Sequence, residues 1–203
     1  LTGNEVRAPS FVGTSRTWYL YGAQVEAGAF LSSYIPTTSS AATRAADLCT
    51  GPVGWVNESE GTLWVEATPG GIDPGAATSP RLLCLTNSGV TSYHELRRLA
   101  SSSAAQGSTV VAGTAQATMG ATAWNNAVTA KAALGWRNND EAFCFAGGTV
   151  ATDTATPGGM PTGLTVLRLG ANSPTGGFFF GYLRGLRGWT RRLSDSQTKA
   201  VTQ

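Results

Sequence analysis

The sequence contains few charged residues. Only 13% of its 203 residues are Asp, Glu, Lys or Arg, against roughly 25% in an average soluble domain. Fourteen Lys and Arg residues stand against twelve Asp and Glu residues, so the net charge is +2. Because binding to nucleic acid or to anionic membranes needs clustered excess base, we expect neither as a partner. Six Trp, five Tyr and seven Phe residues can supply a core, so the low charge does not indicate disorder.

Long apolar runs and an N-terminal export signal are also absent from the sequence. No run approaches the roughly 20 apolar residues of a membrane-spanning helix, so we expect no membrane insertion. Residues 1–4 lack the basic and apolar regions of a signal peptide. The chain does not begin with Met, and we expect it to be a processed or excised piece of a longer protein.

Cysteine and histidine are too rare for a disulfide framework or a zinc site. The three cysteines, Cys49, Cys84 and Cys144, lie far apart and form no C-x-x-C pair. We expect them to be small buried residues, with a single disulfide as the alternative. One histidine cannot by itself build a zinc site, so we expect no metal of that kind.

Glycine and proline, by contrast, are frequent, and they separate short stretches rich in Thr, Val, Leu, Trp and Phe. The sequence has 26 Gly and nine Pro. This pattern is typical of many short strands joined by turns, as in a sandwich or barrel. We expect strands within 61–68, 81–85, 93–99, 108–118, 127–136, 142–146, 164–170 and 178–189.

One short helix is predicted at the end of the chain. Ser194 and Gln197 form an S-x-x-Q capping box, in which the two side chains satisfy two orphan backbone N–H groups reciprocally. The helix should run to about residue 201. No earlier segment has a sustained helical period.

The chain divides into three parts by composition. Residues 1–36 contain one alternating strand at 16–26, which we interpret as the terminal strand of an upstream β-domain or as an N-terminal extension. Residues 37–47 are small and polar and are predicted to be a linker. The alternative is an extended segment that packs on the next domain. Residues 48–203 form the main β-domain.

A first set of motifs resembles phage proteins. The stretches Tyr21–Gly28 (YGAQVEAG), Ser33–Thr37 (SYIPT) and Thr43–Asp47 (TRAAD) resemble a segment of phage tail and virion fibre proteins. In those proteins it often lies between an upstream carbohydrate-binding-module-like β-sandwich and a downstream lectin-like domain. The resemblance implies location in the virion, in a tail fibre or on the capsid surface, after assembly in the host cytoplasm. It also implies other virion proteins as partners and a homotrimer, which the fibre context suggests and the residues do not establish.

A second set of motifs resembles lectins. The stretches Leu167–Gly170 (LRLG), Phe180–Leu186 (FGYLRGL) and Trp189–Asp195 (WTRRLSD) are similar to the closing part of concanavalin A-like, laminin-G-like jelly rolls. The expected fold is therefore all-β, a two-sheet antiparallel jelly-roll sandwich with one short C-terminal helix. Fold alone does not fix function, so the site needs a separate argument.

The sequence lacks the carboxylate pattern of a glycosidase. Jelly-roll glycosidases need paired carboxylates on one strand, as an E-x-D-x-x-E pattern would supply, and none is present. Glu58 and Glu60 lie in a predicted turn. Asp140 and Glu141 are adjacent, so a strand would direct them to opposite faces. We therefore expect no enzyme activity.

Aromatic and amide residues gather in two places that suit a sugar. A sugar is held by an aromatic ring against its apolar face and by directional hydrogen bonds to its hydroxyls. Trp136 followed by Asn138, Asn139 and Asp140 is the preferred site, and Trp124 with Asn125 is the second. The alternatives are that both Trp side chains belong to the core and that residues 138–140 are a hairpin turn.

A weaker polar and aromatic patch is formed by Tyr93, His94 and Arg97. For His94 the alternative is a strand residue with a local hydrogen bond. We expect no cofactor, with calcium as the alternative. Some jelly rolls of this kind bind Ca²⁺ at a rim, and here Asp140 and Asp153 would be its ligands. Trp55, Trp64 and Trp189 are expected in the core. The adjacent pair Arg191–Arg192 is expected to be solvated.

Three functions follow, in order of preference. The first is a non-catalytic, virion-associated adhesin that binds bacterial cell-surface polysaccharide or other glycan. The second is a structural capsid or tail decoration domain without a sugar ligand. A glycoside hydrolase is the third.

Overall fold

The structure is a computed structural model that describes residues 48–70, 79–173 and 176–203, together with positions 17, 19, 23, 34–36 and 40. The strand expected at 16–26, the linker expected at 37–47 and the phage-like motifs lie, apart from those positions, outside the described residues. These expectations and the three-part division of the chain therefore stay predictions. The description below concerns the unit that contains residues 48–203.

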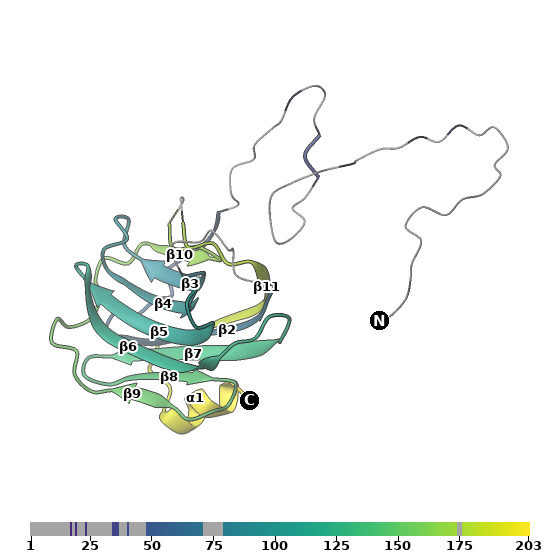
Figure 1. The fold of residues 1–203 in the computed structure, drawn as a ribbon. Coiled ribbons are helices and arrows are strands. Elements are labelled where there is room, and N and C mark those ends of the chain that lie inside the picture. The colour runs from purple at the N-terminus through teal and green to yellow at the C-terminus, as the bar shows by residue number, and fades with distance from the viewer. Residues whose placement is uncertain are drawn as a thin grey trace. The chain divides into compact units, whose positions relative to one another are not determined.

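Two antiparallel sheets form this unit (Figure 1). The six-stranded sheet contains, in spatial order, β1 (Cys49–Gly51), β10 (Val166–Leu169), β3 (Arg81–Thr86), β4 (Tyr93–Arg98), β5 (Ala104–Val111) and β6 (Thr114–Ala123). The five-stranded sheet contains β11 (Gly181–Trp189), β2 (Glu60–Pro69), β7 (Ala130–Arg137), β8 (Glu141–Phe145) and β9 (Ala151–Asp153). The architecture confirms the expected two-sheet antiparallel jelly-roll sandwich.

The C-terminal helix is also confirmed. Helix α1 (Asp195–Val201) begins after Ser194, whose hydroxyl accepts a hydrogen bond from the Gln197 N–H, while the Gln197 side chain accepts one from the Ser194 N–H. No helix in the described ranges is long and apolar enough to cross a bilayer.

Strand alternation places the apolar side chains between the sheets. In β2, Leu63, Val65 and Ala67 are fully buried and belong to the core. Their neighbours in sequence point to the other face, because successive side chains of a strand alternate. Burying one Leu or Val side chain contributes about 1.5–3 kcal/mol, so this alternating row is a large part of what holds the two layers together.

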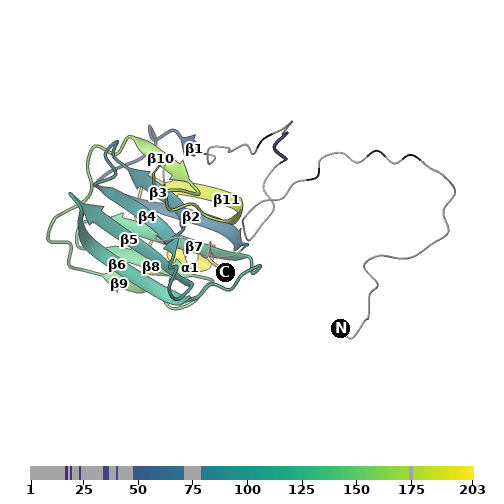
Figure 2. The same ribbon diagram turned by 45° about the horizontal axis from the view of Figure 1, so that its top comes forward.

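The helix covers the outer face of the five-stranded sheet. Trp64 of β2 points away from the core, and its indole N–H donates to the Val201 carbonyl oxygen at 2.7 Å. On β8, the Cys144 sulfur accepts a hydrogen bond from the Thr202 hydroxyl at 3.2 Å. Figure 2 shows α1 beside β7 and β8. Trp64 was expected in the core; it is buried, but beneath the helix.

The stretch 108–118, expected as one β-capable segment, is divided between two strands. β5 and β6 are joined by Ala112 and Gly113, which have φ angles of 48° and 81°. Two positive φ angles in succession fit the tight hairpin turns that suit the twist of paired strands. Ala-Gly is not one of the usual turn signals, so the sequence did not reveal this hairpin.

The cysteines are free. Cys84 and Cys144 are buried as expected, whereas Cys49 is exposed. Burial raises the pKa of the Cys84 thiol to about 12, with the negative charge of Glu95 acting in the same direction. This thiol is therefore protonated at neutral pH and is not a reactive nucleophile.

A buried polar chain connects the two sheets. His94 of β4 and Thr109 of β5 are hydrogen-bonded neighbours at 2.8 Å, and the Thr109 hydroxyl donates to the Glu141 carboxylate of β8 at 2.6 Å. All three side chains have 0% of their surface exposed. Since the single Thr109 proton goes to Glu141, the His94 Nδ1 donates to Thr109 when Glu141 is ionised.

Burial shifts the two titratable groups of this chain in opposite directions. It raises the pKa of Glu141 to about 7, with the charge of Asp153 adding to the effect and the Thr109 hydrogen bond opposing it. It lowers the pKa of His94 to about 3. Both shifts favour the neutral form, since each charged form would lose its hydration in the core.

A first prediction concerns the stability of the core against pH. Between pH 4.5 and 7 the folded protein keeps a proton on Glu141 that the unfolded chain has lost, so this group's contribution to stability declines as pH rises. Glu141→Gln removes that decline. The difference in free energy of unfolding, variant minus wild type, should therefore increase by about 1.4 kcal/mol for each pH unit in this window.

Urea unfolding of both proteins from pH 4 to 7.5 measures the difference. His94 contributes the opposite slope between about pH 3 and 6.5 in both proteins, so it cancels in the comparison. A difference that stays constant with pH would show that Glu141 titrates normally in the fold.

A second prediction concerns Gly61, which leaves room for an aromatic ring. A Cβ atom at this position would overlap the Trp136 ring of the neighbouring strand β7. Gly61→Ala should therefore lower the free energy of unfolding by about 1–3 kcal/mol or more, as overpacking of a core does. Chemical denaturation measures this loss. Gly120→Ala on β6 is the matched control, because no atom lies within 4 Å of its added Cβ. Equal stability of the two variants would contradict the packing described.

Candidate functional site

The two predicted sugar-stacking tryptophans lie in the core. Trp136 has 0% of its surface exposed and stacks on His94 with ring centroids 4.4 Å apart. Trp124 is 1% exposed, and its indole N–H donates to the Val128 carbonyl oxygen. His94 is part of the buried chain described above. These placements correspond to the core alternative that the sequence left open, and we build no site on these three side chains.

The loop at 138–140 is a tight turn between β7 and β8. Asn139 has a φ of 54°, which Asn tolerates well. Its side-chain oxygen accepts a hydrogen bond from the Thr156 N–H at 3.0 Å, and the Asn138 side-chain oxygen accepts one from the Thr156 hydroxyl at 3.1 Å. Both amides are thus used to hold the turn. Asn125, in the other predicted site, lies exposed after β6.

Asp140 is held by arginines. It pairs with Arg137 and, at 2.9 Å, with Arg192, which also pairs with Asp195 at 2.6 Å. The Arg192 side chain is only 5% exposed, so the expectation that both arginines of the pair are solvated was wrong for Arg192. Arg191 is exposed as expected. The attraction of two carboxylates draws Arg192 back onto the protein surface.

The calcium candidates are not brought together by the fold. Asp153 lies in β9 and accepts a hydrogen bond from the Ala155 N–H, whereas Asp140 is engaged by arginines. Within the described ranges, no three His, Cys, Asp or Glu residues are grouped so that they could hold a metal ion.

The outer face of the six-stranded sheet carries a group of polar side chains that converge. His94 and Thr109 point toward the other sheet, as their contacts with Trp136 and Glu141 show. Strand alternation therefore directs the neighbouring residues away from that sheet. We define the outer polar face as seven of the polar residues that β3, β4, β5 and β10 direct outward in this way: Arg81, Tyr93, Glu95, Arg97, Gln106, Ser108 and Arg168.

Glu95 is the centre of the outer polar face. Its carboxylate is 2.9 Å from Arg81 Nε on one side and 2.9 Å from Arg97 Nη1 on the other. The Ser108 hydroxyl donates to it at 3.2 Å. The Glu95 side chain has 0% of its surface exposed, so these partners replace the water that a carboxylate otherwise needs.

Arg97, Gln106 and Tyr93 form the accessible part of the outer polar face. Arg97 Nε donates to the Gln106 side-chain oxygen at 2.6 Å, and the Arg97 side chain is 22% exposed. Tyr93 and Gln106 are both partly exposed. Burial raises the pKa of the Tyr93 hydroxyl, and the negative charge of Glu95 acts in the same direction. The phenol is thus neutral and can both donate and accept a hydrogen bond.

Arg168 of β10 lies at the buried end of the outer polar face. It is opposite Cys84 in the register, and Cys84 is opposite Glu95. One of its terminal nitrogens, Nη1, donates to the Asn172 carbonyl oxygen at 2.6 Å. Its Nε is buried and has no hydrogen-bond partner.

Among the described helices and strands, none packs over the outer face of the six-stranded sheet, although Arg81, Glu95, Ser108 and Arg168 are buried there. The strands β3, β4 and β5 contact their sheet neighbours and strands of the facing sheet, and α1 contacts β7 and β8. The outer face of the five-stranded sheet is thus partly occupied by the helix, whereas no described element packs over the outer polar face.

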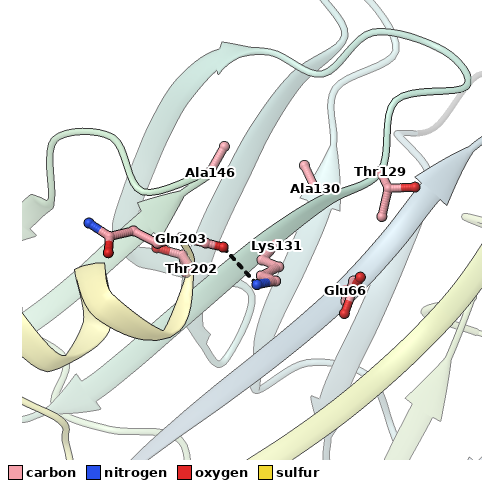
Figure 3. A pocket seen from close by; sticks show the side chains of 7 residues that line it. All are labelled: Glu66, Thr129, Ala130, Lys131, Ala146, Thr202 and Gln203. Carbon is pink, nitrogen blue, oxygen red and sulfur yellow. Dashed lines mark hydrogen bonds between the residues drawn. The ribbon is translucent and has the colours of Figure 1, made fainter.

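A depression on the five-stranded side is a weaker candidate. It has a volume of about 200 Å³ and lies between β2, β7 and the end of α1 (Figure 3). In it, Lys131 points to the Gln203 carbonyl oxygen, to which it donates at 2.6 Å. Ligand pockets are usually about 300–1,000 Å³ and contain aromatic side chains. This one is smaller, and no aromatic residue lines it.

Glu141 and Asp153 are two carboxylates that are register partners in β8 and β9. The pKa of Glu141 is raised, as a general acid requires. However, Glu141 has no exposed surface and points into the core toward Thr109. A substrate cannot reach it in this structure.

Sequence reasoning found part of the outer polar face and missed the rest. Tyr93 and Arg97 were predicted as a patch, and they do lie on one face of β4. Arg81, Glu95 and Arg168 were missed, because they come from three strands and share no sequence motif. The alternation of charged residues within YHELRR was the one available signal, since it directs residues 93, 95 and 97 to the same side.

Comparison with known proteins identifies the fold. No family model matches the chain, and no curated protein matches it. Three similar solved structures are a SAP-like pentraxin from Limulus polyphemus, the IT-sialidase CBM40 of Ruminococcus gnavus, and domain 4 of the GH43 extracellular arabinanase AbnA from Geobacillus stearothermophilus, in complex with arabinotriose.

The similarity to these structures is one of shape. The TM-scores are 0.54, 0.53 and 0.56, with sequence identities of 13%, 16% and 13%. The matches cover 71%, 71% and 77% of this chain and 70%, 83% and 72% of the respective structures. Sialidase from Trypanosoma rangeli also matches, but over only 22% of its own length. The residues from 48 onward therefore have a lectin-like jelly-roll fold, of the kind also found in carbohydrate-binding modules.

Proposed function

We propose that this chain is a non-catalytic glycan-binding module and that it binds through the outer polar face. The observation that carries the proposal is the convergence of arginine, amide and phenol side chains around Glu95 on the outer face of the six-stranded sheet. The ligand class is bacterial cell-surface polysaccharide or another glycan.

The chemistry of the outer polar face suits a sugar. Sugar hydroxyl groups both donate and accept hydrogen bonds, and the face offers the Arg97 guanidinium, the Gln106 amide and the Tyr93 phenol. The Tyr93 ring also supplies an apolar surface for the C–H groups of a sugar ring. Because Glu95 and Gln106 already hold Arg97, little side-chain entropy is lost when a ligand binds.

Two observations support a binding function over catalysis. The raised-pKa carboxyl of Glu141 is enclosed in the core, away from any substrate. The similar structures include a carbohydrate-binding module of a sialidase and a domain of an arabinanase in complex with arabinotriose. We therefore favour a module that holds a glycan without cleaving it.

The setting that we propose is the virion, in a tail fibre or on the capsid surface. Support comes from the resemblance of YGAQVEAG, SYIPT and TRAAD to phage fibre proteins. A single site on an open sheet face binds a sugar weakly. A homotrimeric fibre offsets this, because linking several sites raises avidity by roughly 10²–10⁴-fold.

A third prediction tests the proposed function. Wild-type protein should bind a subset of an array of bacterial polysaccharides and oligosaccharides. Tyr93→Ala and Gln106→Ala should weaken that binding by roughly tenfold or more, as the loss of a central contact does. Tyr182→Ala is the matched control, because that tyrosine is 70% exposed on β11 of the other sheet. The proposal fails if wild type binds no glycan, or if the control weakens binding as much as Tyr93→Ala.

The edge strand β11 favours a second candidate function, in assembly. β11 ends the five-stranded sheet and pairs with β2. It exposes Tyr182, Leu183 and Leu186, with 70%, 37% and 40% of their surfaces accessible. Exposed edges with apolar side chains are sites at which another chain can pair. A capsid or tail decoration domain, or a homotrimer, could be assembled through such an edge.

A fourth prediction tests assembly. If β11 joins copies of the chain, light scattering should give the mass of a trimer for wild type and of a monomer for Leu186→Lys, since a charge in an apolar interface is costly. Val128→Lys, at a site 50% exposed between β6 and β7, should leave the mass unchanged. A monomeric wild type would exclude assembly through this edge.

A further inference from the structure

We propose that the glycan bound at the outer polar face is acidic and that Arg168 and Arg81 bind its carboxylate or sulfate group. This inference rests on the proposed function and narrows its ligand class. Its basis is an excess of cationic side chains over the carboxylates that the structure describes on this face.

The outer polar face has more positive than negative charge. It contains three arginines, Arg81, Arg97 and Arg168, and one carboxylate, Glu95. Glu95 is already engaged by both Arg81 and Arg97. None of the ion pairs in the described part of the chain includes Arg168. Two positive charges therefore remain on a face formed by neighbouring strands.

Arg168 is the least satisfied of the three arginines. Only 7% of its surface is exposed, and its Nε has no hydrogen-bond partner. The acceptor of its hydrogen bond within the described residues is neutral, the Asn172 carbonyl oxygen. A guanidinium removed from water without a counter-charge is costly to the fold, so its presence indicates a role other than stability. An anionic ligand at the exposed part of the guanidinium would supply the counter-charge.

The turn around Gly177 lies next to both Arg81 and Asn172. The Arg81 N–H donates to the Gly177 carbonyl oxygen at 2.8 Å. A Cβ atom at Gly177 would lie 2.5 Å from Asn172 Oδ1 and 3.2 Å from Arg81 Cδ. Asn172, which accepts the hydrogen bond of Arg168, is thus next to the same glycine as Arg81. Two arginines beside one turn favour a planar carboxylate or a sulfate, which accepts several N–H bonds at once.

Matched pairs of acidic and neutral oligosaccharides test the inference on wild-type protein. The pairs include 3′-sialyllactose with lactose, 3′-sulfated lactose with lactose, and oligogalacturonate with galacto-oligosaccharide, measured beside the bacterial polysaccharides. We expect the acidic member of at least one pair to bind tenfold or more tightly than its neutral partner. Because salt screens charge, raising NaCl should weaken binding of the acidic member and not of the neutral one. The carboxylated and sulfated pairs distinguish the two kinds of acid.

Arg168→Gln is the decisive variant. It should weaken binding of the acidic sugar roughly ten- to hundredfold, as loss of a charge-assisted hydrogen bond does, and leave binding of neutral sugars unchanged. Arg187→Gln is the matched control, because that guanidinium lies over Trp64 on the other sheet. The ratio of acidic to neutral affinity is the readout, since a purely structural role of Arg168 would lower both affinities.

The outcomes separate this inference from the proposed function. Equal binding of acidic and neutral members, lost in Tyr93→Ala, would overturn the acidic ligand and leave the glycan-binding module standing. Binding of no glycan at all would overturn both. If Arg168→Gln does not fold, as its melting curve would reveal, the salt dependence of wild-type binding decides instead, and an affinity for acidic sugars that does not change with NaCl would overturn the inference.

Discussion

The ion pairs of Glu95 with Arg81 and Arg97 are the interaction on which the candidate site depends. A carboxylate without exposed surface is tolerated only when its partners replace the lost water. Here the partners come from β3 and from β4 itself, and Ser108 of β5 adds a hydrogen bond. The same contacts hold the arginine side chains in place over the sheet. The same contacts thus stabilise the fold and position the residues of the proposed binding site.

The alternation of side chains along β4 determines which residues point into the core and which point outward. His94 and Leu96 are buried toward the other sheet, whereas Tyr93, Glu95 and Arg97 point outward. One six-residue strand therefore contributes both to the contact with Trp136 in the core and to the outer polar face. A shift of one residue in the register would exchange the two sets and place charges in the core, which fixes the register strongly.

The sequence predicted the fold better than the site, for physical reasons. Strand periodicity and the Ser194 capping box depend on neighbours in sequence, so the sandwich and the helix could be read locally. Trp136 was a candidate for stacking on a sugar, with a place in the core as the alternative, and sequence alone did not decide between them. Its burial depends on Gly61, which lies on another strand and leaves room for the ring. Likewise, Arg81 and Arg168 come onto one sheet face only after β3 and β10 pair, which no local pattern reveals.

The location of bound glycan tests the account most directly. An NMR titration of the protein with the oligosaccharide that scores highest on the array would record which amide signals shift. The account predicts that the largest shifts follow β3, β4 and β5, around Arg81, Arg97 and Gln106. Shifts confined to the turn at 138–140 or to β11 would contradict it, because the ligand would then lie away from the outer polar face.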